Sequence, residues 1–184
     1  MSLKKDFFHH IPEEFHDPVT GLIPQRETEL SALLAHFHLT DQVDWEKVTL
    51  RSVSETVEDS LAHKYIQAGV PFYCEYPLFS NSKTVEIWGG MPADLLCFSA
   101  EKQKIVLIEN KVGSGFTSGG TQLDRQAQYL SSTSFKEKVL IVLGPKVYFE
   151  KGWYVNELSK AQAENKGIAA YTLYWEDIFS AIKS

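Results

Sequence analysis

The sequence has few cysteines, with only Cys74 and Cys97 among its 184 residues. Neither lies in a CxxC motif or beside a histidine-rich segment, so nothing points to a disulfide framework or a zinc site. Both fall in segments expected to be strands, and we expect them to be reduced core residues of a cytoplasmic protein. No apolar run is long enough to cross a membrane, and residues 1–10 lack the apolar stretch of a signal peptide.

An excess of basic residues is also missing, because 18 Lys and Arg stand against 24 Asp and Glu, giving a net charge of −6. This balance argues against a protein that coats nucleic acid through bulk electrostatics. It does not exclude an enzyme that meets a phosphate locally, through a metal and a few lysines. The length fits a single domain over residues 1–184, with an N-terminal helical extension at about 1–50.

Two charged segments stand out because each adjoins a hydrophobic segment. Asp94 precedes the apolar residues 95–98, and Glu109-Asn110-Lys111 follows the apolar residues 105–108. Charged groups at the ends of buried strands are costly to remove from water, so they usually have a partner or a function. Two carboxylates and one ammonium on neighbouring strands suit a divalent cation and a water to be activated.

The expected turn between these strands consists of Glu101 and Lys102. With this turn, the pairing register places Asp94 directly opposite Glu109, with Cβ atoms ~5 Å apart. Because side chains alternate along a strand, Glu109 and Lys111 share one face and converge with Asp94. A slip of one residue would destroy this arrangement, so the inference depends on the two-residue turn.

Two opposed carboxylates repel each other, so either one takes up a proton or a cation lies between them. Hard oxygen ligands with positions left for water and phosphate describe a magnesium site. The structural alternative is that Asp94 caps a strand while Glu109 and Lys111 form ordinary salt bridges. The surrounding elements must decide between these two interpretations.

The order of predicted elements indicates an α/β (α+β) fold, with a mixed β-sheet that contains a strand meander and is flanked by helices. Residues 1–24 should form an irregular arm or short helices, and residues 147–149 a strand or loop. Hydrophobic periodicity and capping signals place the other elements. Helices are expected over residues 25–37, 53–68, 122–131, 155–164 and 175–182, and strands over 71–79, 83–88, 93–99, 104–112, 138–143 and 168–174.

With Pro92-Ala93-Asp94 and Glu109-Asn110-Lys111 on these elements, the chain resembles the PD-(D/E)XK nuclease superfamily over residues 54–174. The run Ile108 to Lys111, followed by Gln122-Leu123, resembles the IENK…QL pattern of small bacterial members. The resemblance implies a restriction-endonuclease-like core: a helix, a three-strand meander carrying D and ExK, a helix and a further strand. Ala93 departs from the superfamily pattern, and the functional Asp94 follows one position later.

Many members of this superfamily carry a glutamate on the first core helix, facing the metal. Two residues of the helix predicted over 53–68 compete for this role. Glu55 follows Ser52 by three residues, and a capping box explains it without a metal. Glu58 lies on the helical face expected to pack on the sheet, so it is preferred. Glu27, on the earlier predicted helix, ranks third.

On the helix predicted after the meander, Gln122, Gln126 and Tyr129 fall on one face. Superfamily members often present a Gln or Lys here to the metal-bound water or the scissile phosphate. Gln122 is the best candidate, because a helix N-terminus also favours anions. A solvated face with one packed tyrosine explains the same spacing equally well. The loop at 113–120 lacks the GK[ST] ending of a phosphate-binding loop, which argues against nucleotide binding.

The resemblance implies a magnesium-dependent nuclease that hydrolyses phosphodiester bonds in DNA and leaves 5′-phosphate and 3′-hydroxyl ends, with Mn²⁺ as a substitute ion. Asp94, Glu109 and the Asn110 carbonyl would hold the ion, with Glu58 contributing directly or through water. Lys111 would position the attacking water or act as a base.

Two alternatives stay open. The acidic net charge favours a catalytically inactive nuclease-fold binding module in a DNA repair or defence system, although such a module has no need of the complete set of Asp94, Glu109 and Lys111. In a housekeeping protein, the same three residues would merely form a buried ion network. The sequence leaves open DNA versus RNA, endonuclease versus exonuclease, and the oligomeric state, with a homodimer among the options.

Overall fold

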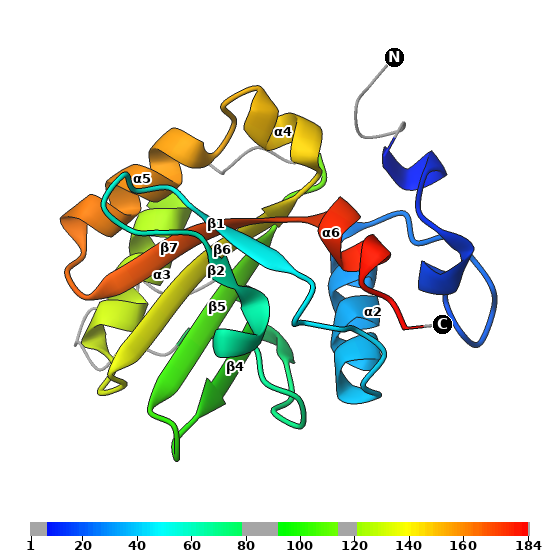
Figure 1. Ribbon diagram of the computed structural model, residues 1–184, viewed down its shortest axis with the longest axis horizontal. Coiled ribbons are helices and arrows are strands. Elements are labelled where there is room, and N and C mark those ends of the chain that lie inside the picture. The colour runs from blue at the N-terminus through cyan, green and yellow to red at the C-terminus, as the bar shows by residue number, and fades with distance from the viewer. Residues whose placement is uncertain (1–6, 79–91, 114–120, 184) are drawn as a thin grey trace.

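The computed structural model of the protein describes residues 7–78, 92–113 and 121–183 (Figure 1). The described strands form one mixed sheet in the order β2-β1-β7-β6-β5-β4-β3, flanked by helices, so the predicted mixed α/β architecture is confirmed. No helix within these ranges is long and apolar enough to span a membrane. The strands are β1 (Thr49–Ser52), β2 (Ser60–Leu61), β3 (Tyr73–Tyr76), β4 (Ala93–Ser99), β5 (Lys104–Asn110), β6 (Glu137–Gly144) and β7 (Ile168–Tyr174). The helices are α2 (Glu27–Leu39), α3 (Thr121–Ser132), α4 (Lys146–Glu150), α5 (Val155–Glu164) and α6 (Trp175–Ser180), with short 3₁₀ turns η1 (Glu13–Phe15) and η2 (Ala62–Lys64).

Strands β4 and β5 form the hairpin that the sequence predicts. Leu95 pairs with Ile108, and the antiparallel ladder continues to Ser99 with Lys104. In the connecting turn, the Gln103 N–H approaches the carbonyl oxygen of the residue three positions earlier at 3.4 Å. The predicted turn and its register are therefore confirmed.

The centre of the sheet is parallel. β6 pairs in parallel with β5 on one side and with β7 on the other. Such pairs need crossover connections, which α3 supplies between β5 and β6, and α4 with α5 between β6 and β7. The apolar runs of β5 and β6 are buried throughout, as expected for parallel strands covered by helices on both faces.

Two hydrophobic cores lie on the two faces of this sheet. Alternation along β5 sends Ile108 into the core shared with α2 and α6, and Leu107 into the core shared with α3 and α5. Figure 1 shows α3 and α5 together at one side of the molecule, and α2 and α6 at the other. A side chain on β4 or β5 therefore reaches either α2 or α3, depending on the parity of its position.

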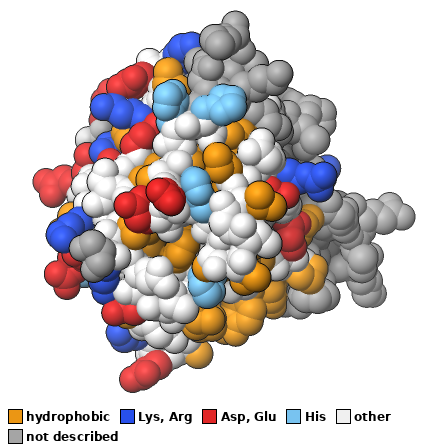
Figure 2. All heavy atoms as spheres, turned by 90° about the vertical axis from the view of Figure 1, so that its right-hand side faces the viewer, with side chains coloured by type: hydrophobic (Ala, Val, Ile, Leu, Met, Phe, Trp, Pro, Cys, Tyr) orange, Lys and Arg blue, Asp and Glu red, His pale blue; other side chains and the backbone are white. Residues whose placement is uncertain are grey.

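The N-terminal segment adds an aromatic layer to the α2 side. The ring of Phe15 lies 4.8 Å from that of Phe37 and 5.5 Å from that of Trp175, measured between centroids. Trp175 is fully buried. Seen from outside, this face carries hydrophobic, acidic and histidine side chains side by side, while its described Lys and Arg side chains lie toward the margins (Figure 2).

The helix predicted over residues 53–68 is wrong. β1 instead pairs with β2, which precedes the 3₁₀ turn η2, and with β7 on its other side. The Ser52 hydroxyl accepts a hydrogen bond from the Ser54 N–H instead of capping a helix. The Ser52 N–H in turn donates to Asp59 Oδ1. Pairing with a distant strand has overridden a weak local helix signal.

Smaller corrections concern single segments. Residues 147–149, expected as a strand or loop, lie in helix α4, which begins directly after Pro145, where a strand cannot readily continue. Cys74 is exposed on β3, whereas Cys97 is buried as expected. The strand predicted over residues 83–88 lies outside the described residues.

A buried histidine ties helix α2 to the loops that follow it. Trp45 Nε1 donates to Nδ1 of His38 at 2.9 Å, and Nε2 lies 2.6 Å from the Val70 carbonyl oxygen. Since an indole N–H can only donate, Nδ1 accepts and the single ring proton is on Nε2. Burial lowers the pKa of His38, because a charged imidazole would lose both its hydration and the bond from Trp45.

We predict that this histidine makes the protein less stable in mild acid. Because the pKa of His38 is lowered in the folded state, the unfolded chain binds a proton that the folded chain excludes, and stability falls as the pH drops below about 6.5. One such proton contributes at most about 1.4 kcal/mol per pH unit. Denaturant unfolding between about pH 5 and pH 8 should show a flatter profile for His38→Gln than for the parent, whereas exposed His36→Gln should follow the parent. Equal profiles for the parent and His38→Gln would contradict the prediction.

Candidate active site

The predicted residues of the β4–β5 hairpin converge at one end of the two strands. The register of the ladder places Asp94 opposite Glu109, one step beyond the pair of Leu95 and Ile108. Lys111 Nζ lies 2.7 Å from Glu109 Oε1, and both side chains are buried. Alternation directs the carboxylate of Glu109 and the ammonium of Lys111 to the face covered by α3.

Asp94 bridges the end of the ladder through its own side chain. Its Oδ2 accepts the main-chain N–H of Asn110 at 2.6 Å. The pKa of Asp94 is raised to about 8, first because burial penalises the charged form and second because Glu109 is negative; the Asn110 N–H and Lys111 oppose this only in part. Burial also raises the pKa of Glu109, against the opposing effects of Lys111 and Gln126. Ionisation of both carboxylates would therefore place more negative charge at the site than Lys111 compensates.

Helix α3 contributes two amides to this site. Gln122 Nε2 donates to Glu109 Oε1 at 2.5 Å, and Gln122 Oε1 accepts from Lys111 Nζ at 3.3 Å. Gln126, one turn further along, donates from Nε2 to Glu109 Oε2 at 2.6 Å. Gln122 thus reaches the predicted position. The spacing of four residues had put Gln126 on the same face, but nothing in the sequence marked it as a partner of Glu109.

The other amide oxygen of Gln126 differs from the rest of the site. Gln126 is fully buried, and its Oε1 is the one buried side-chain oxygen or nitrogen within the described ranges that has no hydrogen-bond partner. An unsatisfied buried acceptor costs about 1–3 kcal/mol. Such a group in a polar site suggests that a donor, for example a water, belongs next to it.

The side chain of Asn110 has a structural role, while its main-chain N–H bonds to Asp94. Its Nδ2 donates to the Glu27 carbonyl at 3.0 Å and to Ser31 Oγ at 3.1 Å, and its Oδ1 accepts from Trp175 Nε1 at 3.0 Å. The side chain therefore joins β5 to α2 and α6 on the face opposite α3. The predicted metal ligand, the Asn110 carbonyl, is separate from this network.

The helical carboxylate at this end of the sheet is Glu27, the third-ranked candidate. Its Oε1 accepts the Val112 N–H at 2.6 Å, and its charge raises the pKa of Glu109. Glu58, the preferred candidate, and Glu55 are both exposed between β1 and β2, at the opposite edge of the sheet from β4. The choice of Glu58 depended on the wrong helix, so the structure does not bring it to the site.

The backbone at Lys111 packs closely against the end of β6 and the start of α4. The Lys111 N–H donates to the Leu143 carbonyl at 2.8 Å. A Cβ at Gly144 would lie 2.9 Å from the Lys111 carbonyl oxygen, so only glycine fits there without a shift. Tyr148 then donates from its hydroxyl to the Val112 carbonyl at 3.2 Å. These contacts fix the backbone position from which Lys111 projects.

Within the described ranges, no group of three or more His, Cys, Asp or Glu side chains is arranged to hold a metal ion. The oxygen donors available at the site are the carboxylates of Asp94 and Glu109 and the Asn110 carbonyl. The carboxylate of Glu27 is engaged with the Val112 N–H. An ion here would thus be held by two side chains and one main-chain oxygen.

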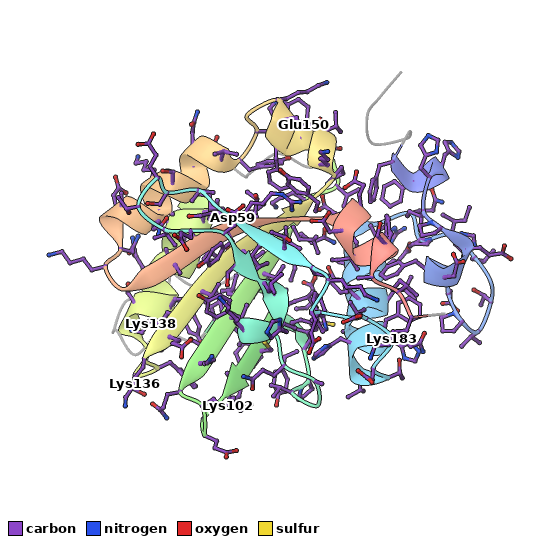
Figure 3. All side chains as sticks on the ribbon, viewed as in Figure 1. Asp59, Lys102, Lys136, Lys138, Glu150 and Lys183 are labelled. Atoms are coloured by element: carbon purple, nitrogen blue, oxygen red, sulfur yellow. The ribbon has the colours of Figure 1, made fainter. Side chains whose placement is uncertain are left out.

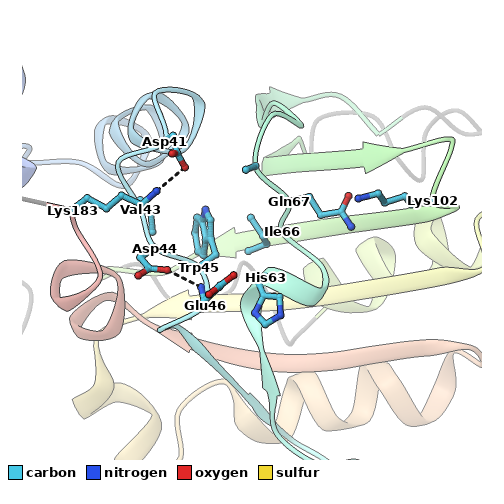
Figure 4. Close-up of a pocket in the computed structure, with 11 residues that line it drawn as sticks. Asp41, Val43, Asp44, Trp45, Glu46, His63, Ile66, Gln67, Lys102 and Lys183 are labelled. Carbon is cyan, nitrogen blue, oxygen red and sulfur yellow. Dashed lines mark hydrogen bonds and ion pairs between the residues drawn. The ribbon is translucent and has the colours of Figure 1, made fainter.

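A cavity of about 410 Å³ lies elsewhere, near the C-terminal end of α2 (Figure 4). Trp45, His63 and Lys102 line it, and an ion pair of 2.8 Å joins Asp41 and Lys183 at its margin. None of the predicted site residues contributes to it. The cavity is therefore separate from the carboxylate site.

Comparisons of the chain with protein-family models, with curated proteins and with solved structures found no match. The resemblance to the PD-(D/E)XK superfamily stays a prediction from the sequence. The case for a function accordingly depends on the geometry and charge of the site.

We predict that Asp94→Asn stabilises the metal-free protein in mild base. Since the pKa of Asp94 is raised to about 8, the folded state holds a proton that the unfolded state releases above about pH 4, and stability falls as the pH rises between these values. The variant removes this loss. Its melting temperature should exceed that of the parent by several degrees near pH 9, because about 1 kcal/mol shifts it by about 2–4 °C in a chain of this size.

The matched control is Glu101→Gln, in the exposed turn of the same hairpin. Thermal unfolding is measured with a chelator at about pH 5 and pH 9. The difference in melting temperature between this control and the parent should be the same at both pH values. If Asp94→Asn also melts in parallel with the parent at both pH values, Asp94 is not a site of uncompensated charge.

Proposed function

We propose that the protein is a magnesium-dependent nuclease that hydrolyses phosphodiester bonds in DNA. One observation carries the proposal: Asp94 and Glu109, both with raised pKa values, occupy facing strand positions with Lys111 as the adjacent cation. Glu27 adds a third carboxylate whose charge is felt at Glu109. Excess negative charge is costly at a buried site, and a divalent cation would neutralise it.

The donors fit Mg²⁺ or its substitute Mn²⁺. Carboxylate and carbonyl oxygens are the hard ligands that Mg²⁺ prefers, and because it keeps several waters, few protein ligands are needed. The Asn110 N–H points to Asp94, and in a strand the carbonyl of the same residue is directed to the same side. Asp94, Glu109 and this carbonyl would hold the ion, and Glu27 takes the place of Glu58 as the nearby helical carboxylate. A bound ion would stabilise charge on the phosphate and acidify a water.

The remaining residues of the site have roles in orientation. Lys111 lies between Glu109 and Gln122, and once a cation balances Glu109, the ammonium can orient a water or contact a phosphate oxygen. Gln126 holds Glu109 Oε2, while its buried Oε1 can accept a hydrogen bond from a water at the ion. Gln122 keeps Lys111 and Glu109 in register with each other.

The order of elements supports the proposal. Helix α2 precedes the antiparallel strands β3, β4 and β5, and the crossover helix α3 leads to β6, which is parallel to β5. This order agrees with the layout that the superfamily resemblance implies, with Asp94 on β4 and Glu109 and Lys111 at the end of β5. Cleavage that leaves a 5′-phosphate is the expectation from that resemblance.

Two other candidates are a buried ion network alone and a nuclease-fold binding module without catalysis. The ion network is supported because both oxygens of Glu109 already have partners in Lys111, Gln122 and Gln126, so the network is closed without a metal. The net charge of −6 favours the binding module. Against the ion network stands the raised pKa of Asp94, which a network built for stability alone has no reason to keep.

We predict magnesium-dependent cleavage of DNA that needs Asp94 and Lys111. The parent protein, incubated with linear duplex, circular and single-stranded DNA, should cleave at least one substrate with Mg²⁺ and none with a chelator. Asp94→Asn and Lys111→Ala should each lower the rate by about 10²-fold or more, because they remove an ion ligand and the residue that orients the water. Lys160→Ala, on the exposed side of α5, should cleave as the parent does.

Circular dichroism checks that each variant is folded. The check is needed because removal of Lys111 leaves Glu109 without its buried cation, which destabilises the protein. Asp94→Asn, which relieves charge, tests the same site without that cost. Magnesium-dependent cleavage that persists in folded Lys111→Ala or Asp94→Asn would refute the assignment of the site.

We further predict that Glu27, and not Glu58, supports cleavage. Glu27→Gln keeps an oxygen that can accept the Val112 N–H but loses the charge that faces Glu109, so the rate should fall about tenfold or more. Glu58→Gln, which alters an exposed loop, should stay within about twofold of the parent. Rates measured at several Mg²⁺ concentrations separate weaker ion binding from slower chemistry. The opposite ranking of the two variants would restore the original choice of Glu58.

A further inference from the structure

Two tyrosines of β3 lie on the same face although their spacing forbids it in a regular strand. Residues three positions apart should point to opposite faces. The rings of Tyr73 and Tyr76 are nevertheless in edge contact, with centroids 5.8 Å apart. Between them, Glu75 has a φ of 49°, in the left-handed region that such residues rarely adopt. The local backbone conformation thus brings both rings together.

This face is the one that carries the carboxylates. Tyr73 stacks on Phe98 of β4, with centroids 5.5 Å apart and planes 15° from parallel. Phe98 and Asp94 are four positions apart on β4, so alternation gives them the same face. Tyr76 pairs with Ala93, the neighbour of Asp94. The aromatic surface therefore begins beside the candidate active site.

The surface extends away from the site along the sheet. Phe98 contacts Phe135, with ring centroids 6.0 Å apart. The rings of Tyr76, Tyr73, Phe98 and Phe135 are here named the aromatic strip. Tyr73 is 42% exposed, whereas the other three pack against the core on the α3 side and stay partly accessible. An exposed tyrosine at the end of a row of partly accessible rings offers a flat surface on which another ring can stack.

Positive charge lies at the far end of the strip. The Lys136 N–H donates to the Gln103 carbonyl at 3.0 Å, which sets Lys136 beside the β4–β5 turn and Lys102. Lys138 donates from its ammonium to the carbonyls of Ser131 and Thr133, at 2.9 and 2.7 Å. Figure 3 shows Lys102, Lys136 and Lys138 at this end of the sheet. Because Lys102 lines the separate cavity and the Lys138 ammonium is held by two carbonyls, the exposed Lys136 is the cation best placed to meet a ligand on the strip. Nearby, Lys104 is neutralised by Glu137, and Glu101 is the one opposing carboxylate of the turn.

We propose that the aromatic strip binds single-stranded nucleic acid, whose bases stack on Tyr73 while Lys136 contacts a phosphate, and leads it to Asp94 and Glu109. This inference rests on the proposed nuclease function and adds its substrate class. Unpaired bases expose π-faces that a duplex hides, and stacking with a few local cations needs no overall basic charge. The net charge of −6 is compatible with this mode of binding.

The test measures binding without cleavage. Asp94→Asn in a chelator serves as the background, and fluorescence anisotropy follows a labelled 20-nucleotide oligo-dT. Tyr73→Ala should weaken binding about tenfold, since removing a stacking ring typically costs about 1–3 kcal/mol per base. Tyr73→Phe, which keeps the ring, should bind within about twofold of the background. Trp153→Ala, an equally exposed aromatic at 44% on the turn between α4 and α5, should also bind as the background does.

Charge variants provide a second, independent arm that leaves the packing of the rings unchanged. With Lys136 on a phosphate, log Kd against log salt should have a slope of at least about 0.7 in magnitude, and Lys136→Ala should reduce that slope by about 0.7. A duplex of the same length should bind at least about tenfold more weakly than oligo-dT. Melting temperatures confirm that each variant is folded.

The inference is overturned if the background protein does not bind oligo-dT, if Tyr73→Ala binds unchanged, if Trp153→Ala loses binding instead, or if duplex binds as well as the single strand. These outcomes are independent of catalysis. Binding that depends on Tyr73 in a protein that never cleaves DNA would uphold the strip and refute the nuclease. If the protein cleaves DNA but Tyr73→Ala does not change its binding of oligo-dT, the nuclease proposal would stand and the aromatic strip would be refuted.

Discussion

The pairing register of β4 and β5 is the constraint on which the rest of the structure depends. The two-residue turn of Glu101 and Lys102 fixes this register, and the ladder keeps it as far as the pair of Leu95 and Ile108. With this register, the apolar residues of both strands enter the two cores while Asp94 and Glu109 meet on the α3 side. A slip of one residue would send every one of these side chains to the wrong face. The same register that builds the core therefore brings the two carboxylates of the site together.

Charge then explains how the surroundings of the site are organised. Glu109 is buried, and three donors from Lys111, Gln122 and Gln126 satisfy its two oxygens. Within residues 7–78, 92–113 and 121–183, Asp94 receives the Asn110 N–H alone, and its pKa stays raised to about 8. On the reverse face, the Asn110 side chain ties β5 to α2 and α6, which gives the backbone of the site a rigid support. The site is rigid in its framework yet short of positive charge, a combination that suits the reception of a cation.

Local patterns in the sequence predicted the parts of the fold that local chemistry determines. The β4–β5 hairpin, β7 and α5 occur at the expected residues because turn signals, alternation and helical periodicity agree there. The helix over residues 53–68 failed because β1 is held by β7, a partner far along the chain that no local window contains. The same error displaced the helical carboxylate: Glu27 reaches the site only through the packing of α2 against the sheet, and Gln126 became recognisable only once α3 was seen over Glu109. Geometry within one hairpin was predictable, whereas contacts between distant elements were not.

The central claim is that the opposed carboxylates form a binding site for a divalent cation. Isothermal titration calorimetry with Mn²⁺ and Mg²⁺, at about pH 8 and without nucleic acid, tests it most directly. The account predicts one ion bound per chain, with protons released on binding because the raised pKa of Asp94 leaves it partly protonated, and no binding to folded Asp94→Asn. Absence of binding to the parent protein, or equal binding to Asp94→Asn, would contradict it and leave Asp94, Glu109 and Lys111 as a buried ion network.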